Sequence, residues 1–171
     1  MTVAVETGLW QLERTASTVA VQQKTMWGMV NVKGVFTAVS GEGEVRPDGG
    51  AVGTITLDAA SLDTKHTKRD THLRSADFFD VENHPSITFV VQGAEARQDD
   101  TVRVTGRLTV RGVTRPVSFT AKVSGASAAS VTLEAEFTVD RGEFGISWNQ
   151  MGMMRGLTTI TTSLRFSRAA G

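Results

Sequence analysis

Cysteine is absent from the 171 residues of this chain. Disulfides, thiolate nucleophiles and cysteine-based metal sites are therefore excluded. An excess of one charge sign is absent too, because 18 basic residues balance 18 acidic ones. A chain without net charge has no long-range field that attracts nucleic acid or an anionic membrane surface. The composition therefore predicts no nucleic-acid partner.

Long apolar runs are missing as well. The first ten residues contain neither the basic region nor the run of about 7–15 apolar residues that marks a secretory leader. No later segment approaches the roughly 20 apolar residues that a membrane-spanning helix needs. We therefore expect a cytoplasmic protein without stable membrane insertion, and the length predicts one domain over residues 1–171.

Alternation of polar and apolar residues is the strongest pattern in the chain. From 101 to 111, every odd position is Thr or Arg and every even position is apolar or Gly. The same period recurs at 117–123, 131–139 and 160–166, and less regularly in the N-terminal half, whereas a helix is expected only near 67–75. Such strands with short turns indicate an all-β fold, either a sandwich or a closed antiparallel β-barrel of about eight strands with one short helix. Closure is the commoner way to remove exposed strand edges.

The predicted inward face mixes large apolar side chains with Gly106, Ala121, Ala135 and Thr162. An eight-stranded barrel is either just filled by its side chains or able to hold one small ligand. Small residues at these positions suit both a tapered, packed core and a hollow interior. Periodicity alone favours the packed core.

Residues 68–89 form the most distinctive segment of the chain. A polar helical turn with both charge signs precedes the Phe78-Phe79 pair, and Pro85 then leads into an apolar strand. This succession resembles the signature of the YceI-like family, the lipocalin-like polyisoprenoid-binding proteins. Further segments resemble that family's motifs in order and spacing, at 32–36, 106–117 and 140–148. The resemblance covers about residues 8–167.

The resemblance implies a single lipocalin-like barrel with a hollow interior, which reverses the preference for a packed core. Its implied function is to carry or store a long-chain isoprenoid or similar amphiphile, such as a quinone or a polyprenyl lipid. No other cofactor, no catalytic residue and a possible homodimer are expected. An apolar chain in such a tunnel gains roughly 0.8 kcal/mol per buried CH₂. The residues expected to line the tunnel are Val19, Val21, Met29, Phe36, Ile55, Phe89, Val104, Leu108, Phe119, Leu133, Phe137 and Leu164.

One departure from the family pattern bears on the ligand. Typical members carry a His-Ser pair after the first strand and a second His at the end of the next strand. This chain has Ala16-Ser17 at the first place and Lys24-Thr25 near the second. If those histidines contact a head group in relatives, that contact is absent here, and the ligand differs although the barrel is shared.

The predicted mouth of the barrel combines methionine with tryptophan. Met151, Met153 and Met154 lie on a glycine-punctuated segment rather than in a strand. Methionine is flexible and polarizable, which suits contact with a variable apolar partner. Trp27 and Trp148 add rigid apolar walls. These residues form either a lid that contacts the ligand or an ordinary packed loop.

The three histidines do not predict a metal site. His66 and His72 fall on different faces of a helix, and no pair of ligands has a recognised metal-binding spacing. Instead, we expect Arg69, Asp70 and Arg74 to hold the helix against the barrel through hydrogen-bonded ion pairs.

No nucleophile elbow and no dinucleotide-binding fingerprint is present, so the sequence does not favour an enzyme. Two alternatives to a lipid carrier stay open. An enzyme acting on a small apolar substrate would show a carboxylate or His with a perturbed pKa inside the barrel. A packed interaction module would show a filled interior.

Overall fold

The computed structural model describes residues 7–25, 30–48, 50–97, 99–146 and 157–168. Short 3-10 turns lie among them at Arg14–Ala16, Ala59–Ser61 and Arg141–Phe144. The regular elements are β1 (Gly8–Leu12), β2 (Thr18–Thr25), β3 (Val30–Phe36), β4 (Val39–Val45), β5 (Ala51–Asp58), β6 (Leu62–Asp63), α1 (Thr67–Arg74), β7 (Ser86–Ala96), β8 (Thr101–Val110), β9 (Val113–Ser124), β10 (Ser130–Val139) and β11 (Thr158–Arg168).

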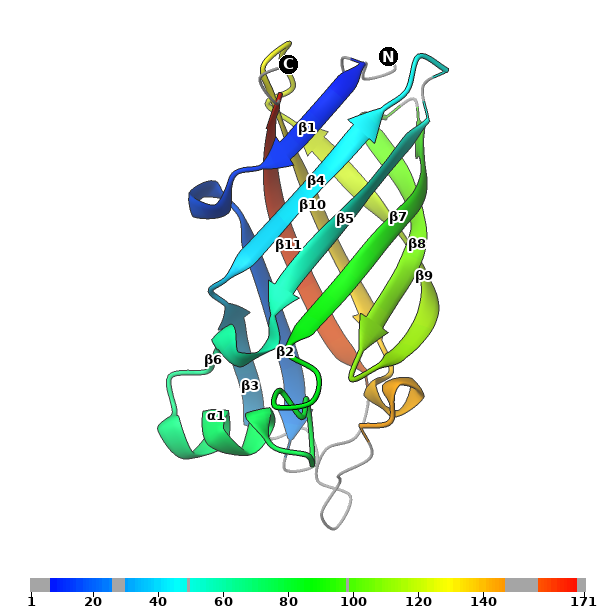
Figure 1. Cartoon of the computed structure of the whole chain (residues 1–171). Coiled ribbons are helices and arrows are strands. Elements are labelled where there is room, and N and C mark those ends of the chain that lie inside the picture. The colour runs from blue at the N-terminus through cyan, green and yellow to red at the C-terminus, as the bar shows by residue number, and fades with distance from the viewer. Residues whose placement is uncertain (1–6, 26–29, 49, 98, 147–156, 169–171) are drawn as a thin grey trace.

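These strands build an eight-stranded barrel, because six of them are halves of three interrupted long strands (Figure 1). The chain passes from β1 to β2 through the turn Arg14–Ala16, from β3 to β4 through residues 37–38, and from β5 to β6 through the turn Ala59–Ser61. Each long strand then pairs antiparallel with the next one along the chain. The topology is therefore a simple up-and-down meander.

The last strand closes the ring. Thr159–Ser163 of β11 pair with β2, and Phe166–Arg168 pair with β1. The closed antiparallel barrel of about eight strands that the sequence predicts is confirmed, and the sandwich alternative is wrong.

The two ends of the barrel differ. At the upper end as drawn in Figure 1, Trp10 is 4% exposed and packs with Val123 and Val131. This apolar cluster lies on β1, β9 and β10 and does not line the interior cavity. The lower end carries α1 and the turn Arg141–Phe144 (Figure 1).

Helix α1 is the short helix predicted near 67–75. Its first turn is capped by His66, whose Nδ1 accepts a hydrogen bond from the N–H of Arg69 at 3.1 Å. It ends where the N–H of Ser75 donates to the carbonyl of His72 at 3.0 Å. Within the described part of the chain, no helix is long and apolar enough to cross a membrane.

Gly106 allows β7 and β8 to approach each other closely. A Cβ atom at this position would lie 2.3 Å from the carbonyl oxygen of Val90 and 2.7 Å from Cζ of Phe89. Gly93, at the irregularity of the same pair of strands, has no such neighbour within 4 Å. The absence of a side chain at Gly106 therefore gives the Phe89 ring its place on the inner face.

We predict that Gly106→Ala lowers the free energy of unfolding by about 1–3 kcal/mol, because the new methyl group forces Phe89 and the β7 backbone apart. Gly93→Ala, the matched control, should change it by less than about 0.5 kcal/mol. Urea denaturation of both variants measures the difference. Equal free energies of unfolding for the two variants would show that the space at Gly106 can accept a methyl group.

Candidate functional site

A cavity of about 180 Å³ lies inside the barrel. Its described wall is apolar except for Arg141, Thr158 and Thr162. The wall includes every predicted tunnel residue that the structure describes: Val19, Val21, Phe36, Ile55, Phe89, Val104, Leu108, Phe119, Leu133, Phe137 and Leu164. Met29, the remaining predicted tunnel residue, lies outside the described residues.

The small inward residues account for the hollow interior. Ala121, Ala135 and Thr162 all line the cavity. Gly106 is not among the lining residues, because the Phe89 ring occupies the space next to it. The interior is therefore packed at some positions and hollow at others, and the fully packed core that periodicity alone favours is not what the structure shows.

A second, larger cavity of about 450 Å³ opens at the lower end of the barrel, between β2, β3 and α1. We call it the vestibule. It shares five wall residues with the interior cavity, so the two spaces adjoin. The shared residues are Val21, Phe79, Arg141, Ile146 and Thr158.

The vestibule is cationic where the interior is apolar. Its titratable lining residues are His66, Lys68, Arg69, His72 and Arg141, and no described lining residue is a carboxylate. Carboxylates lie behind this wall: that of Asp77 is 2.8 Å from Nε2 of His72, and Oδ1 of Asp70 accepts from the N–H of the lining residue Thr64 at 3.0 Å. The rest of the described vestibule wall is largely apolar, with Leu62, Leu73 and Phe78 among its residues.

Arg141 stands at the junction of the two cavities. Its Nη1 donates to the carbonyl of Ile146 at 3.0 Å, and the preceding Asp140 caps the turn by accepting from the N–H of Gly142 at 2.9 Å. Burial lowers the pKa of the Arg141 guanidinium, while the charge of Asp140 acts in the opposite direction. An arginine stays protonated in spite of such a shift. A partly desolvated cation therefore lies where the apolar wall ends.

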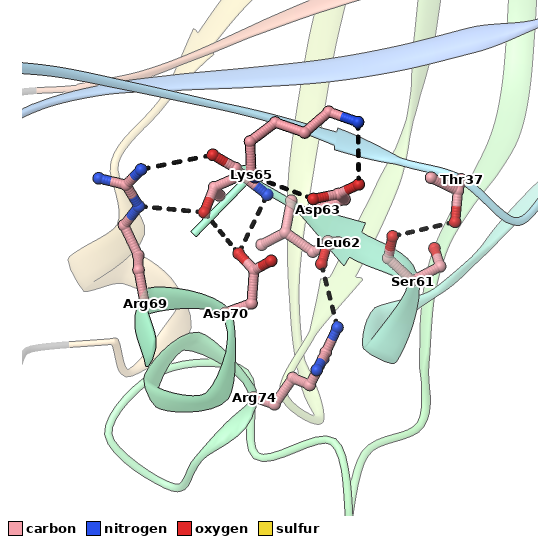
Figure 2. A network of polar contacts seen from close by, with 9 residues as sticks. Thr37, Ser61, Leu62, Asp63, Lys65, Arg69, Asp70 and Arg74 are labelled. Carbon is pink, nitrogen blue, oxygen red and sulfur yellow. Dashed lines mark hydrogen bonds and ion pairs between the residues drawn. The ribbon is translucent and has the colours of Figure 1, made fainter. Parts of the chain in front are cut away.

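Polar contacts with neutral groups hold α1 in place (Figure 2). Oδ1 of the buried Asp70 accepts hydrogen bonds from the N–H of Thr64, at 3.0 Å, and from its hydroxyl. Nε of Arg69 donates to Oγ1 of Thr64 at 3.0 Å, and Nε of Arg74 donates to the carbonyl of Ala60 at 3.1 Å. The three predicted residues do fix the helix, but through a hydroxyl and main-chain groups rather than through the expected ion pairs. The acceptors that these arginines reach lie on residues 60–64, in and around β6.

The histidines have separate local roles. His66 caps α1, His72 contacts Asp77, and the ring of His84 lies over Gly112 at the β8–β9 turn. Among the described residues, no three His, Asp or Glu side chains gather as a metal site.

The predicted mouth residues Trp27, Trp148, Met151, Met153 and Met154 lie outside the described residues. Ile146 and Thr158, which flank the segment 147–156 in sequence, both line the vestibule. Sequence reasoning missed Phe79, Phe144 and Arg141 as wall residues. They lie in turns, where no alternation marks which side chain points inward.

Comparison with known proteins agrees with this geometry. A family model described as the YceI-like domain matches residues 10–166. The chain belongs to the YceI-like family.

Curated relatives align with part of this YceI-like chain. A UPF0312 protein of Azotobacter vinelandii is 44% identical over 71 residues, which are 42% of this chain and 37% of the relative. A UPF0312 protein of Pseudomonas putida is 38% identical over 98 residues, which are 54% of this chain and 51% of the relative. The chain thus spans between about a third and a half of the length of these relatives.

Solved structures match nearly the whole YceI-like barrel. BcnA of Burkholderia cenocepacia superposes with a TM-score of 0.81 at 22% identity, over 90% of this chain and 98% of that one. A polyisoprenoid-binding domain of Saccharophagus degradans, implicated in plant cell wall breakdown, gives 0.76 at 16% identity, over 96% of this chain and 100% of that one. At these identities the likeness shows the shared fold.

One of the two places at which this chain departs from the YceI-like pattern, Ala16-Ser17, lies away from both cavities. Ser17 accepts a hydrogen bond from the N–H of Arg165 at 3.0 Å, and neither Ala16 nor Ser17 lines a cavity. Gln22 and Gln23 of β2 line the vestibule, and the buried Gln23 accepts a hydrogen bond from the hydroxyl of Thr158.

We predict that Asp70→Ala lowers the free energy of unfolding by about 1–3 kcal/mol, because it leaves the buried N–H of Thr64 without an acceptor. The control is Asp77→Ala, which removes a carboxylate from the exposed pair with His72 and should cost less than about 1 kcal/mol. Chemical denaturation of both variants gives the comparison. A small effect at Asp70 would mean that α1 is held mainly by its apolar contacts.

Proposed function

We propose that this YceI-like barrel binds an amphiphile whose apolar chain occupies the interior cavity and whose anionic head group lies in the vestibule. The observation that carries the proposal is the direct junction, at Arg141, of an apolar cavity with a vestibule lined by basic side chains. Apolar chains gain free energy from burial, and an anion gains from nearby cations that are partly shielded from water.

The cavity sizes favour a ligand that occupies both spaces. Small-molecule pockets commonly measure about 300–1,000 Å³. The interior, at about 180 Å³, is below that range, whereas the vestibule, at about 450 Å³, lies within it. A long chain that filled the interior would therefore extend into the vestibule, where its polar end meets the basic residues.

A polyisoprenoid is the chain we favour. The related Saccharophagus degradans domain is described as polyisoprenoid-binding and shares the fold over almost the entire chain. Of the ligands that the family suggests, a polyprenyl lipid with an anionic head group fits the vestibule better than a neutral quinone, which supplies no charge for Lys68, Arg69 and Arg141. The expectations of a cytoplasmic location and of a homodimer stay predictions.

The interior offers little for catalysis. No carboxylate or histidine is among the described residues of its wall, and its polar members are one arginine and two threonines. A carrier uses such a wall, since it needs solvent exclusion and not proton transfer.

Native mass spectrometry after mild purification from the source organism tests the function directly, and Ala135→Phe tests the place of binding. The wild-type protein should retain one amphiphile per barrel or take up an added polyprenyl phosphate. Ala135→Phe should weaken uptake at least tenfold, because the ring fills the cavity. Ala20→Phe, on the outer face of β2, is the matched control and should bind normally. Unchanged uptake by Ala135→Phe would place the chain elsewhere.

The head-group assignment predicts a charge-dependent affinity. Lys68→Glu should weaken binding of a prenyl phosphate roughly three- to tenfold, because an attractive charge at the vestibule becomes repulsive. Binding of the corresponding uncharged prenol should stay the same. Lys122→Glu, on the outer face of β9, controls for net charge. Titration calorimetry at two salt concentrations measures these affinities, and equal losses for phosphate and alcohol would contradict an anionic head group.

A further inference from the structure

Among the junctions between the eight long strands, as far as the structure describes them, the one between β9 and β10 has the shortest pairing. Between β9 and β10 the pairing consists of three residue pairs, 124 with 132, 123 with 133 and 122 with 134. On either side of this junction, β8–β9 and β10–β11 each have ten. Below the three pairs, residues 113–121 and 135–139 do not pair with each other, although both segments are fully described. We call this unpaired junction the seam.

The backbone of β9 presents unpaired groups to the seam. The N–H of Val123 donates to the carbonyl of Asp100 at 2.9 Å, on the β8 side. Because successive residues of an antiparallel strand point their hydrogen-bonding groups to opposite neighbours, the N–H groups of Ser118 and Thr120 point towards β10. Pro116 lies an even number of residues from Ser118 and Thr120, so its backbone nitrogen also faces β10. Proline, however, has no N–H to donate. A proline in the middle of a strand is tolerated at such an edge.

Two aromatic rings bridge the seam on its inner side. Phe119 of β9 and Phe137 of β10 stack with ring centroids 4.4 Å apart and planes 5° apart. Both line the interior cavity, yet both are only partly buried, whereas Phe36 of the same cavity is 3% exposed. The stacked pair therefore stands between the cavity and the outside of the barrel.

Both ends of the seam are held. The three ladder pairs hold its upper end. At its lower end, Nη1 of Arg111 donates to the carbonyl of Gly145 at 2.8 Å, and Nε of Arg115 donates to the carbonyl of Glu143 at 3.0 Å. These bonds connect the β8–β9 hairpin to the turn that follows β10. The part of the seam between these contacts is its middle, where the two rings lie.

We propose that the seam is a side portal through which the apolar chain of the ligand enters the barrel, with Phe119 and Phe137 as its gate. The proposal rests on the function proposed above. Separating the two rings breaks no ladder hydrogen bond, so it opens the wall at less cost than parting any fully paired strands. The Trp10 cluster packs at the upper end and basic side chains line the vestibule at the lower end, whereas the seam borders the apolar interior directly through Phe119 and Phe137. The seam is the route whose inner lining is apolar.

Because the chain has no cysteine of its own, a pair of introduced cysteines can be cross-linked specifically across the seam. Continuing the register of the three pairs places Ser118 opposite Thr138, with both side chains on the outer face. The variant S118C/T138C can be cross-linked by a short, reducible bis-methanethiosulfonate reagent. The control variant K122C/E134C carries the same cross-link across a pair that is already in the ladder. Uptake of a fluorescent polyene fatty acid is followed by stopped flow before cross-linking, after it and after reduction.

The cross-linked S118C/T138C protein should load at least tenfold more slowly, recover on reduction and keep its equilibrium affinity within about twofold. The cross-linked control should load like the wild type. An unchanged loading rate in S118C/T138C, with binding intact, overturns the portal and leaves the proposed function standing. Absence of binding in the wild-type protein, both of this probe and of an added polyprenyl phosphate, overturns both.

Amide hydrogen exchange tests the seam without any ligand. The amides of Ser118 and Thr120 should exchange much faster than those of Lys122 and Ser124, which have ladder partners in β10. Similar protection at all four amides would show that β9 and β10 are paired throughout and would overturn the inference.

Discussion

Closure of the ladder by β11 is the constraint on which the rest of the structure depends. Because this strand pairs with β2 over its lower half and with β1 at its upper end, the interrupted first strand is fixed to the last one along both of its parts. In a closed eight-stranded ring, every inward side chain faces a shared interior of limited width. Whether a ligand fits is then decided by a few side-chain volumes.

Those volumes differ along the barrel axis. Trp10 fills the upper end, Phe89 fills the space left by Gly106, and the short side chains of Ala121 and Ala135 leave the cavity between them. The lower end is completed by parts that do not belong to the ring, namely α1 and the turn with Arg141. An apolar interior that opens at one end into a vestibule lined by basic side chains is the basis of the proposed binding of an amphiphile in one direction.

The strands and the cavity wall were predictable because side-chain direction in a strand depends only on position along the chain. Alternation identified Val104, Leu108 and Leu164 as inward residues, and the structure places them in the wall. The vestibule was not predictable in this way. It combines residues of β2, α1 and the turn at Arg141 that are far apart in sequence, and no period marks them as neighbours. The predicted ion pairs around Asp70 were wrong for the same reason, since the partners of Asp70 and Arg74 are Thr64 and the carbonyl of Ala60, on either side of β6.

The sequence by itself determined the class of fold, the inward face of each strand and the resemblance to a lipid-binding family, because these depend on local spacing and residue type. Only the tertiary structure decided the size of the cavity, the gathering of basic residues at one mouth and the short pairing between β9 and β10. Each of these depends on strand register and on how separate segments meet when the ring closes. Pro116 illustrates this difference. A proline in a strand suits an edge position, but only the register shows that the edge is the side of β9 that faces β10 within a closed barrel.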